Sequence, residues 1–134
     1  GEILYEPESS EVGTYEIRLT PEGSKDELLG HLPPRFMAQL GRKDRAVRLP
    51  EGIANLASSR LNPHQAFRVP HQPIWATQFH PELTGEENRL RFDRYRQGYG
   101  SVMSETEQQL TLNRFRESPE TETLIARFLE LVFG

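Results

Sequence analysis

Three short apolar segments follow one another in the middle of the chain, and the turns between them are too short to hold a helix. They are residues 54–58, 65–69 and 74–79, with Pro63, Pro70 and Pro73 in the intervening turns. Proline beside a strand is typical of edge strands and hairpins. Because parallel strands need a long crossover connection, this spacing predicts a mixed sheet with antiparallel members rather than a series of β-α-β units.

Before these segments the pattern predicts more strands and one short helix. The strands are expected at residues 2–5, 12–19 and 36–40, and the alternation in 12–19 places the apolar side chains on one face. Ser24 and Glu27 have the spacing of a capping box, which predicts that a short helix begins at Ser24. Residues 41–44 are predicted to form a polar loop.

After residue 83 the chain becomes more polar, and three helices are predicted. Their N-terminal signals are two capping boxes and a serine–proline pair, at Thr84 with Glu87, Ser104 with Glu107, and Ser118 with Pro119. The first helix is expected to end near Gln97 and the second to include Phe115. The whole set of elements is α/β, with a hydrophobic core mostly before residue 84.

Composition excludes several kinds of chemistry. The chain contains no cysteine, which rules out disulfides, thiolate metal sites and thiol catalysis by this chain alone. A net charge of −4 gives no reason to expect a nucleic-acid partner. The arginines Arg89, Arg91, Arg94 and Arg96 alternate with acidic residues and predict a solvated, salt-bridged helix face.

The chain shows no apolar run long enough to cross a membrane and no opening signal peptide, which predicts a cytoplasmic protein with no membrane partner. The first residue is glycine, and a strand is expected almost at once. That abrupt beginning predicts a processed or trimmed piece.

The third apolar segment ends in His80, and a carboxylate follows at Glu82. A histidine at the end of a strand can act as a base, and a neighbouring glutamate can orient its imidazole and stabilise its protonated form. The alternative is that His80-Pro81-Glu82 is only a turn. The other histidines, His31, His64 and His71, lack the spacing of metal ligands, and surface or capping roles are predicted for them. Ser58 and Ser59 lack the glycine-flanked elbow of a serine hydrolase.

Four segments together resemble one family. Phe79-His80-Pro81-Glu82, preceded by Ala76-Thr77-Gln78, looks like the histidine–glutamate signature of class I glutamine amidotransferases, including the glutaminases of GMP synthases. The other three, in family order, are Ser10–Tyr15 leading to Leu19-Thr20-Pro21, Gly41–Asp44 followed by Leu49–Gly52, and Leu56–Ser59 followed by Asn62–Phe67. Residues 84–134 lie outside this resemblance, apart from a terminal helix.

The resemblance implies a fold, a reaction and a site. The fold is a flavodoxin-like amidotransferase domain, incomplete here, with its C-terminal half at residues 1–83 and a helical C-terminal extension packing on the same domain at 84–134. A Cys-His-Glu triad hydrolyses the amide of glutamine or a γ-glutamyl substrate without a cofactor or a metal. His80 would be the base and acid and Glu82 its partner, while Val12, Gly13 and Thr14 would line the glutamine site.

The missing cysteine leaves two hypotheses. In the first, the nucleophile lies in the N-terminal half of the same domain, which would be the partner of this piece. In the second, the chain is a catalytically inactive relative that acts as a binding or interaction module. A homo-oligomer is a further expectation, because an incomplete domain should expose a sheet edge and apolar surface. Arg42 stands where many relatives have histidine; it is predicted to be a surface or partner-facing contact, which argues against coupling to a synthase subunit.

Overall fold

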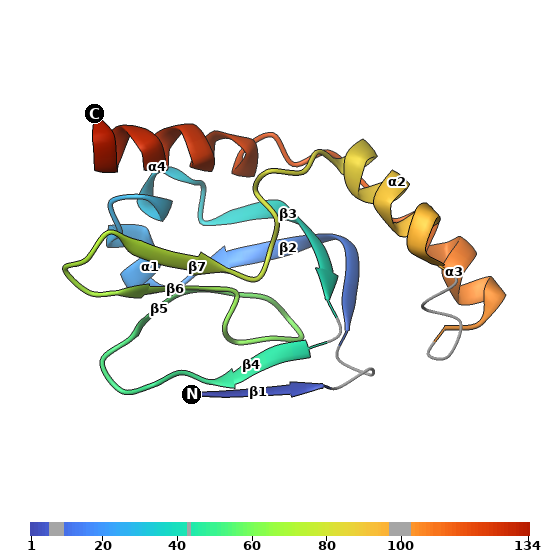
Figure 1. Cartoon of the computed structure of the whole chain (residues 1–134), viewed down its shortest axis with the longest axis horizontal. Coiled ribbons are helices and arrows are strands. Elements are labelled where there is room, and N and C mark those ends of the chain that lie inside the picture. The colour runs from blue at the N-terminus through green and yellow to red at the C-terminus, as the bar shows by residue number, and fades with distance from the viewer. Residues whose placement is uncertain (6–9, 43, 97–102) are drawn as a thin grey trace.

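A curled antiparallel sheet forms the centre of the structure, a computed structural model that describes residues 1–5, 10–42, 44–96 and 103–134. Five strands follow the order β3-β2-β5-β6-β7, and a separate two-stranded ribbon pairs β1 with β4 (Figure 1). The strands are β1 (Glu2–Tyr5), β2 (Glu11–Leu19), β3 (Arg35–Arg42), β4 (Asp44–Arg48), β5 (Ala54–Ser58), β6 (Ala66–Val69) and β7 (Ile74–Thr77). The helices are α1 (Pro21–Lys25), α2 (Gly85–Tyr95), α3 (Glu105–Leu112) and α4 (Leu124–Phe133), with short 3-10 turns η2 (Leu29–His31) and η4 (Thr121–Thr123).

The three strands expected in the middle of the chain are confirmed as neighbours. β5 pairs with β6, and β6 pairs with β7 from Ala66 opposite Thr77 to Val69 opposite Ile74. Every strand pair in the described ranges is antiparallel, so the parallel members of the predicted mixed sheet do not occur there. The short turns between β5, β6 and β7 reverse the chain at once, which leaves no crossover for a parallel neighbour.

The polar loop predicted at residues 41–44 is incorrect, because strands occupy both ends of that range. β3 continues to Arg42, which lies directly opposite Glu11 of β2, and the next strand, β4, begins at Asp44 and pairs with β1. Opposite charges across an antiparallel pair favour continued pairing. Polar composition therefore did not distinguish a loop from a paired strand.

The first helix begins earlier than its predicted capping box. Thr20 is the N-cap of α1, because its hydroxyl accepts a hydrogen bond from the backbone N–H of Gly23 at 3.0 Å, and Pro21 occupies the first turn. A Cβ on Gly23 would lie 1.9 Å from the carbonyl oxygen of Leu56, so only glycine allows α1 to approach β5 this closely. The helix predicted to start at Ser24 is incorrect.

Two of the three helix starts predicted after residue 83 are confirmed, and the third is wrong. Both hydrogen bonds of the Thr84–Glu87 capping box are present at α2, and the Ser104 side chain caps α3. α3 ends at Leu112 rather than including Phe115, while the expected end of α2 at Gln97 lies outside the described residues. Ser118 is not an N-cap: its hydroxyl accepts from the Gln39 amide at 2.9 Å, and α4 begins at Leu124.

Apolar side chains form two clusters. The larger contains Ile17, Leu29, Phe36, Leu56 and Phe79 with seven further buried residues, and only Leu124 of these lies beyond residue 84, as predicted. The smaller joins Val12 to Phe92, Leu112 and Phe115, and so fastens α2 and α3 to β2. The division into residues 1–83 and 84–134 stays a prediction.

Candidate active site

The backbone at His80 is held by its neighbours on both sides. Phe79 is 2% exposed and packs edge-on against Phe36, with ring centroids 5.9 Å apart. The backbone N–H of His80 donates to the carbonyl oxygen of Gln39 at 2.8 Å, which ties the end of the β7 segment to β3. Burial of Phe79 therefore places the next side chain, that of His80, at the edge of the core, where it is 30% exposed.

His80 and Glu82 form the pair that their spacing predicted. Nδ1 of His80 lies 2.7 Å from Oε1 of Glu82. A carboxylate accepts, so this contact selects the tautomer with hydrogen on Nδ1 and leaves the lone pair on Nε2. Nη1 of Arg91 lies 3.5 Å from that Nε2 and donates towards it. The imidazole is thus oriented on one side by an acid and approached on the other by a guanidinium.

A cavity of about 380 Å³ adjoins this group. Its lining consists of Val12, Gly41, Asn88, Arg91, Phe92 and Tyr95. Val12 is the member of the predicted substrate-binding trio that lines it. Gly13 follows with a φ of 132°, and Thr14 is buried, with its hydroxyl bonded to Oε1 of Gln39 at 3.0 Å and to the carbonyl oxygen of Arg116 at 2.9 Å.

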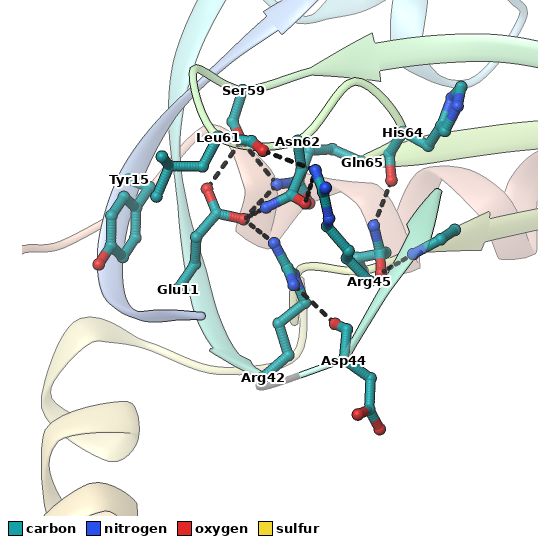
Figure 2. Close-up of polar contacts among 12 residues, drawn as sticks. Glu11, Tyr15, Arg42, Asp44, Arg45, Ser59, Leu61, Asn62, His64 and Gln65 are labelled. Carbon is teal, nitrogen blue, oxygen red and sulfur yellow. Dashed lines mark hydrogen bonds and ion pairs between the residues drawn. The ribbon is translucent and has the colours of Figure 1, made fainter. Parts of the chain in front are cut away.

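A second polar cluster surrounds Glu11, and the sequence did not predict it (Figure 2). The Glu11 side chain is 1% exposed and pairs with the guanidinium of Arg42. It also accepts from Asn62 at 2.5 Å, from Gln65 at 2.7 Å and from the Ser59 hydroxyl at 2.7 Å. This arrangement joins β2, β3 and the loop before β6, and its role is to hold them together.

Arg42 is therefore not the surface or partner-facing contact that was predicted. Its side chain is 11% exposed, and Nη1 also donates to the carbonyl oxygen of Asp44 at 2.6 Å. The register of β2 against β3 puts Arg42 opposite Glu11, and a buried charge is tolerated only with such a partner. The sequence shows a charged residue beside each of the two strands, Glu11 and Arg42. Because it does not show the register of the strands, it could not predict that the two side chains meet. Arg42 consequently gives no reason to exclude a synthase partner.

The other three histidines differ in exposure, and His64 is half-buried rather than on the surface. His31 and His71 are exposed, and His71 adopts a φ of 63° in a turn. Within the described ranges no group of His, Asp and Glu is arranged to hold a metal ion. The described helices include none with the length and apolar character needed to cross a bilayer.

Among the described residues, the arginines of α2 form fewer salt bridges than predicted. Arg96 pairs with Asp93 at 3.4 Å, which is the expected salt bridge. For Arg89, Arg91 and Arg94 no ion pair is found within the described part of the chain. Arg91 turns towards His80 instead, and its i+11 separation from His80 gave no sequence signal for that contact.

The chain is similar to known proteins in sequence and in structure. It is 34% identical over 79 residues to one subunit of a glutamine-hydrolyzing GMP synthase of Methanosarcina acetivorans, covering 53% of this chain and 42% of that subunit. It is 30% identical over 88 residues to a glutamine-hydrolyzing GMP synthase of Wolinella succinogenes, covering 65% of this chain and 17% of that protein. A glutamine amidotransferase of Thermotoga maritima has a TM-score of 0.70 with 18% identity, covering 97% of this chain and 54% of that one. No protein-family model matches the chain.

These likenesses show the fold of the chain. The chain has the α/β, flavodoxin-like fold of the class I glutamine amidotransferases. Its sequence relatives include glutamine-hydrolyzing GMP synthases. It spans about half or less of each of these relatives, in agreement with the prediction that it corresponds to the C-terminal half of such a domain. The structural match also includes most of the helical segment after residue 84, which the sequence resemblance had left out.

Proposed function

We propose that the protein containing this chain hydrolyses the side-chain amide of glutamine or of a γ-glutamyl compound. His80 is the general base and acid, and Glu82 orients it. The observation that carries the proposal is the 2.7 Å contact between Nδ1 of His80 and Oε1 of Glu82, on a backbone anchored by buried Phe79. The names of the sequence relatives, which include glutamine hydrolysis, support an enzyme rather than the alternative binding module.

The reaction requires a nucleophile from outside residues 1–134, because these contain no cysteine. A thiol close to Nε2 of His80 would lose its proton to that nitrogen and attack the amide carbon. The same imidazolium would then protonate the nitrogen that leaves as ammonia, and a thioester would remain. Water, deprotonated by His80, would cleave the C–S bond of that thioester to release the carboxylic acid and restore the thiol. Glu82 stabilises the imidazolium during both steps. Val12, Gly13 and Thr14 remain the proposed wall of the glutamine site, with Val12 supported by its place in the cavity.

Ammonia release tests this proposal in the complete protein. His80→Ala should lower kcat for L-glutamine roughly 10²- to 10⁴-fold, since proton transfer in the transition state contributes about that much. Glu82→Gln should cause a smaller loss of kcat, because it removes the acceptor that selects the tautomer of His80. His71→Ala, an exposed histidine in a turn, is the matched control and should leave the rate unchanged.

Two outcomes would contradict the proposal. One is that the complete protein releases no ammonia from L-glutamine or from γ-glutamyl amides. The other is that His80→Ala retains the full rate. Either result would indicate that His80-Pro81-Glu82 is only a turn without a catalytic role.

A further inference from the structure

The side chain of Arg91 reaches the one ring nitrogen of His80 that the proposed reaction uses. Its Nη1 group lies 3.5 Å from Nε2 of His80, and no carboxylate in the described part of the chain forms an ion pair with it. Because Glu82 accepts from Nδ1, the lone pair of the ring is on Nε2, and the guanidinium donates towards it. A donor therefore occupies the only acceptor that this neutral imidazole offers.

This contact opposes the role of His80 as a base. The lone pair that would accept the proton of a thiol is already engaged, so a nucleophile reaches Nε2 only after the guanidinium has moved away. A guanidinium keeps its charge and all its donors at any physiological pH, so Arg91 does not release Nε2 by losing a proton. Glu82 orients the ring from the other side, and its contact with Nδ1 does not require Arg91.

The guanidinium can leave Nε2 by a rotation of its own side chain, because the backbone of α2 is fixed beside it. The next residue, Phe92, is 3% exposed and belongs to the cluster that includes Val12 and Phe115. The side chain of Arg91 is exposed and borders the cavity of about 380 Å³, which leaves it room to turn. A separation of 3.5 Å is long for a hydrogen bond, so little free energy is lost when it breaks.

We propose that Arg91 is a positioning residue that restrains His80 in a resting state. Its guanidinium covers Nε2 until a thiol approaches, and it then turns aside. In the step that follows, the S–H bond breaks, the proton forms an N–H bond with Nε2, and the sulfur attacks the amide carbon. Arg91 gains and loses no proton in this step. The inference rests on the proposed amide hydrolysis for the role of Nε2.

The first ammonia released by the complete protein tests the restraint, because its release follows the step in which His80 takes the thiol proton. Rapid-quench measurement at saturating L-glutamine removes any effect of weaker or tighter substrate binding. Arg91→Ala should raise this first-turnover rate constant roughly 2- to 10-fold, the factor that corresponds to the net free energy of one hydrogen bond. Arg91→Lys, which keeps a cationic donor, should stay near the unchanged protein. Damage to the fold lowers a rate, so a purely structural role does not produce this increase.

The ring nitrogens of His80 test the contact without any reaction. In nitrogen NMR spectra of the histidine-labelled complete protein, Arg91→Ala should move the Nε2 resonance towards that of a free, unprotonated ring nitrogen. The Nδ1 resonance, which reports the contact with Glu82, should stay where it is, and His71 serves as an internal reference. Arg94→Ala is the matched control, because Arg94 is exposed on the same helix and does not line the cavity. It should change neither the Nε2 resonance nor the rate.

The inference is overturned if the Nε2 resonance does not respond to Arg91→Ala, or if this variant releases its first ammonia no faster than the unchanged protein. Either result can occur while His80→Ala loses its rate, and the proposed hydrolysis would then stand without the restraint. A full rate in His80→Ala would instead refute the hydrolysis and the restraint with it. The His80→Ala variant therefore tells the two failures apart.

Discussion

At the scale of single residues, a buried carboxylate organises more of this molecule than the candidate catalytic pair does. Glu11 bonds to Arg42 at the end of β3 and to Ser59, Asn62 and Gln65 in the loop between β5 and β6. Removing one member of a buried ion pair leaves the other charge without compensation. His80 and Glu82, by contrast, are partly exposed, and water can replace either partner.

Replacing Glu11 should therefore destabilise the protein strongly. Glu11→Ala is expected to lower the free energy of unfolding by about 3–5 kcal/mol, the usual effect of breaking a buried pair. Urea denaturation of the complete protein measures this change in the free energy of unfolding. Glu16→Ala is the control on the same strand, because Glu16 pairs with Arg18 at the exposed surface, and it should cost less than about 1 kcal/mol. Equal effects of the two substitutions would show that the cluster does not stabilise the fold.

At the scale of elements, α2 is the segment that connects the proposed chemistry to the rest of the chain. Its N-terminus has reciprocal caps between Thr84 and Glu87, and Glu117 accepts from the N–H of Glu86 at 3.2 Å. A Cβ on Gly85 would lie 2.1 Å from the carbonyl oxygen of Arg116, so the 113–118 segment packs directly on this end of the helix. Because Arg91 lies on α2, its contact with His80 depends on how this helix is docked.

The cap should make the stability of α2 depend on pH. Hydrogen bonds from the backbone and the hydroxyl of Thr84 hold the pKa of Glu87 below its ordinary value of 4.5. A carboxylate with a lowered folded pKa contributes stability above its unfolded pKa and loses it as the pH falls through the folded pKa. The stability advantage over Glu87→Gln should therefore be present at neutral pH and disappear in acid.

Urea denaturation of both proteins between neutral and acidic pH measures this difference. Thr84→Ala should cost about 1 kcal/mol at neutral pH by removing the N-cap hydroxyl. The control is Glu86→Gln, since no described backbone N–H donates to the Glu86 carboxylate, and it should show no comparable pH dependence. A Glu87→Gln protein whose stability parallels the unchanged protein at every pH would contradict the role of the cap.

At the scale of the whole molecule, the chain leaves apolar surface uncovered. α4 lies across one side of the curled sheet in Figure 1, and Leu124 is its buried contact. Ile125, Leu129 and Phe133, which recur every four residues on the helix, are 45%, 49% and 78% exposed. A patch of this kind is typical of a surface that another polypeptide covers. The expectation of exposed apolar surface is confirmed, whereas its partner stays a prediction.

A preparation of residues 1–134 alone should therefore associate. Light scattering over a range of concentrations is expected to give a mass above the 15.5 kDa of one chain. Leu129→Ser combined with Phe133→Ser should shift the distribution towards the single chain, because it removes apolar area from the exposed face. Glu130→Ser on the same helix should not. A stable monomer before any substitution would refute the prediction.

Local signals predicted the features that depend on a few neighbouring residues. The strands of 54–79, the box at Thr84 and the His80–Glu82 contact all follow from short spacings, since the groups involved meet through the local backbone. Errors arose where local signals competed: Thr20 and Ser24 both resemble N-caps, and packing of Gly23 against Leu56 favoured the earlier one.

By itself, then, the sequence determined the α/β class, the family resemblance and the catalytic candidates, because these rest on residue types at short separations. Only the tertiary structure decided that Arg42 is buried against Glu11 and that Arg91 reaches His80. Both contacts depend on strand register and on the docking of a helix, which join residues distant in the chain. Register and docking are set by the burial of many side chains at once, and no local pattern of residues records them.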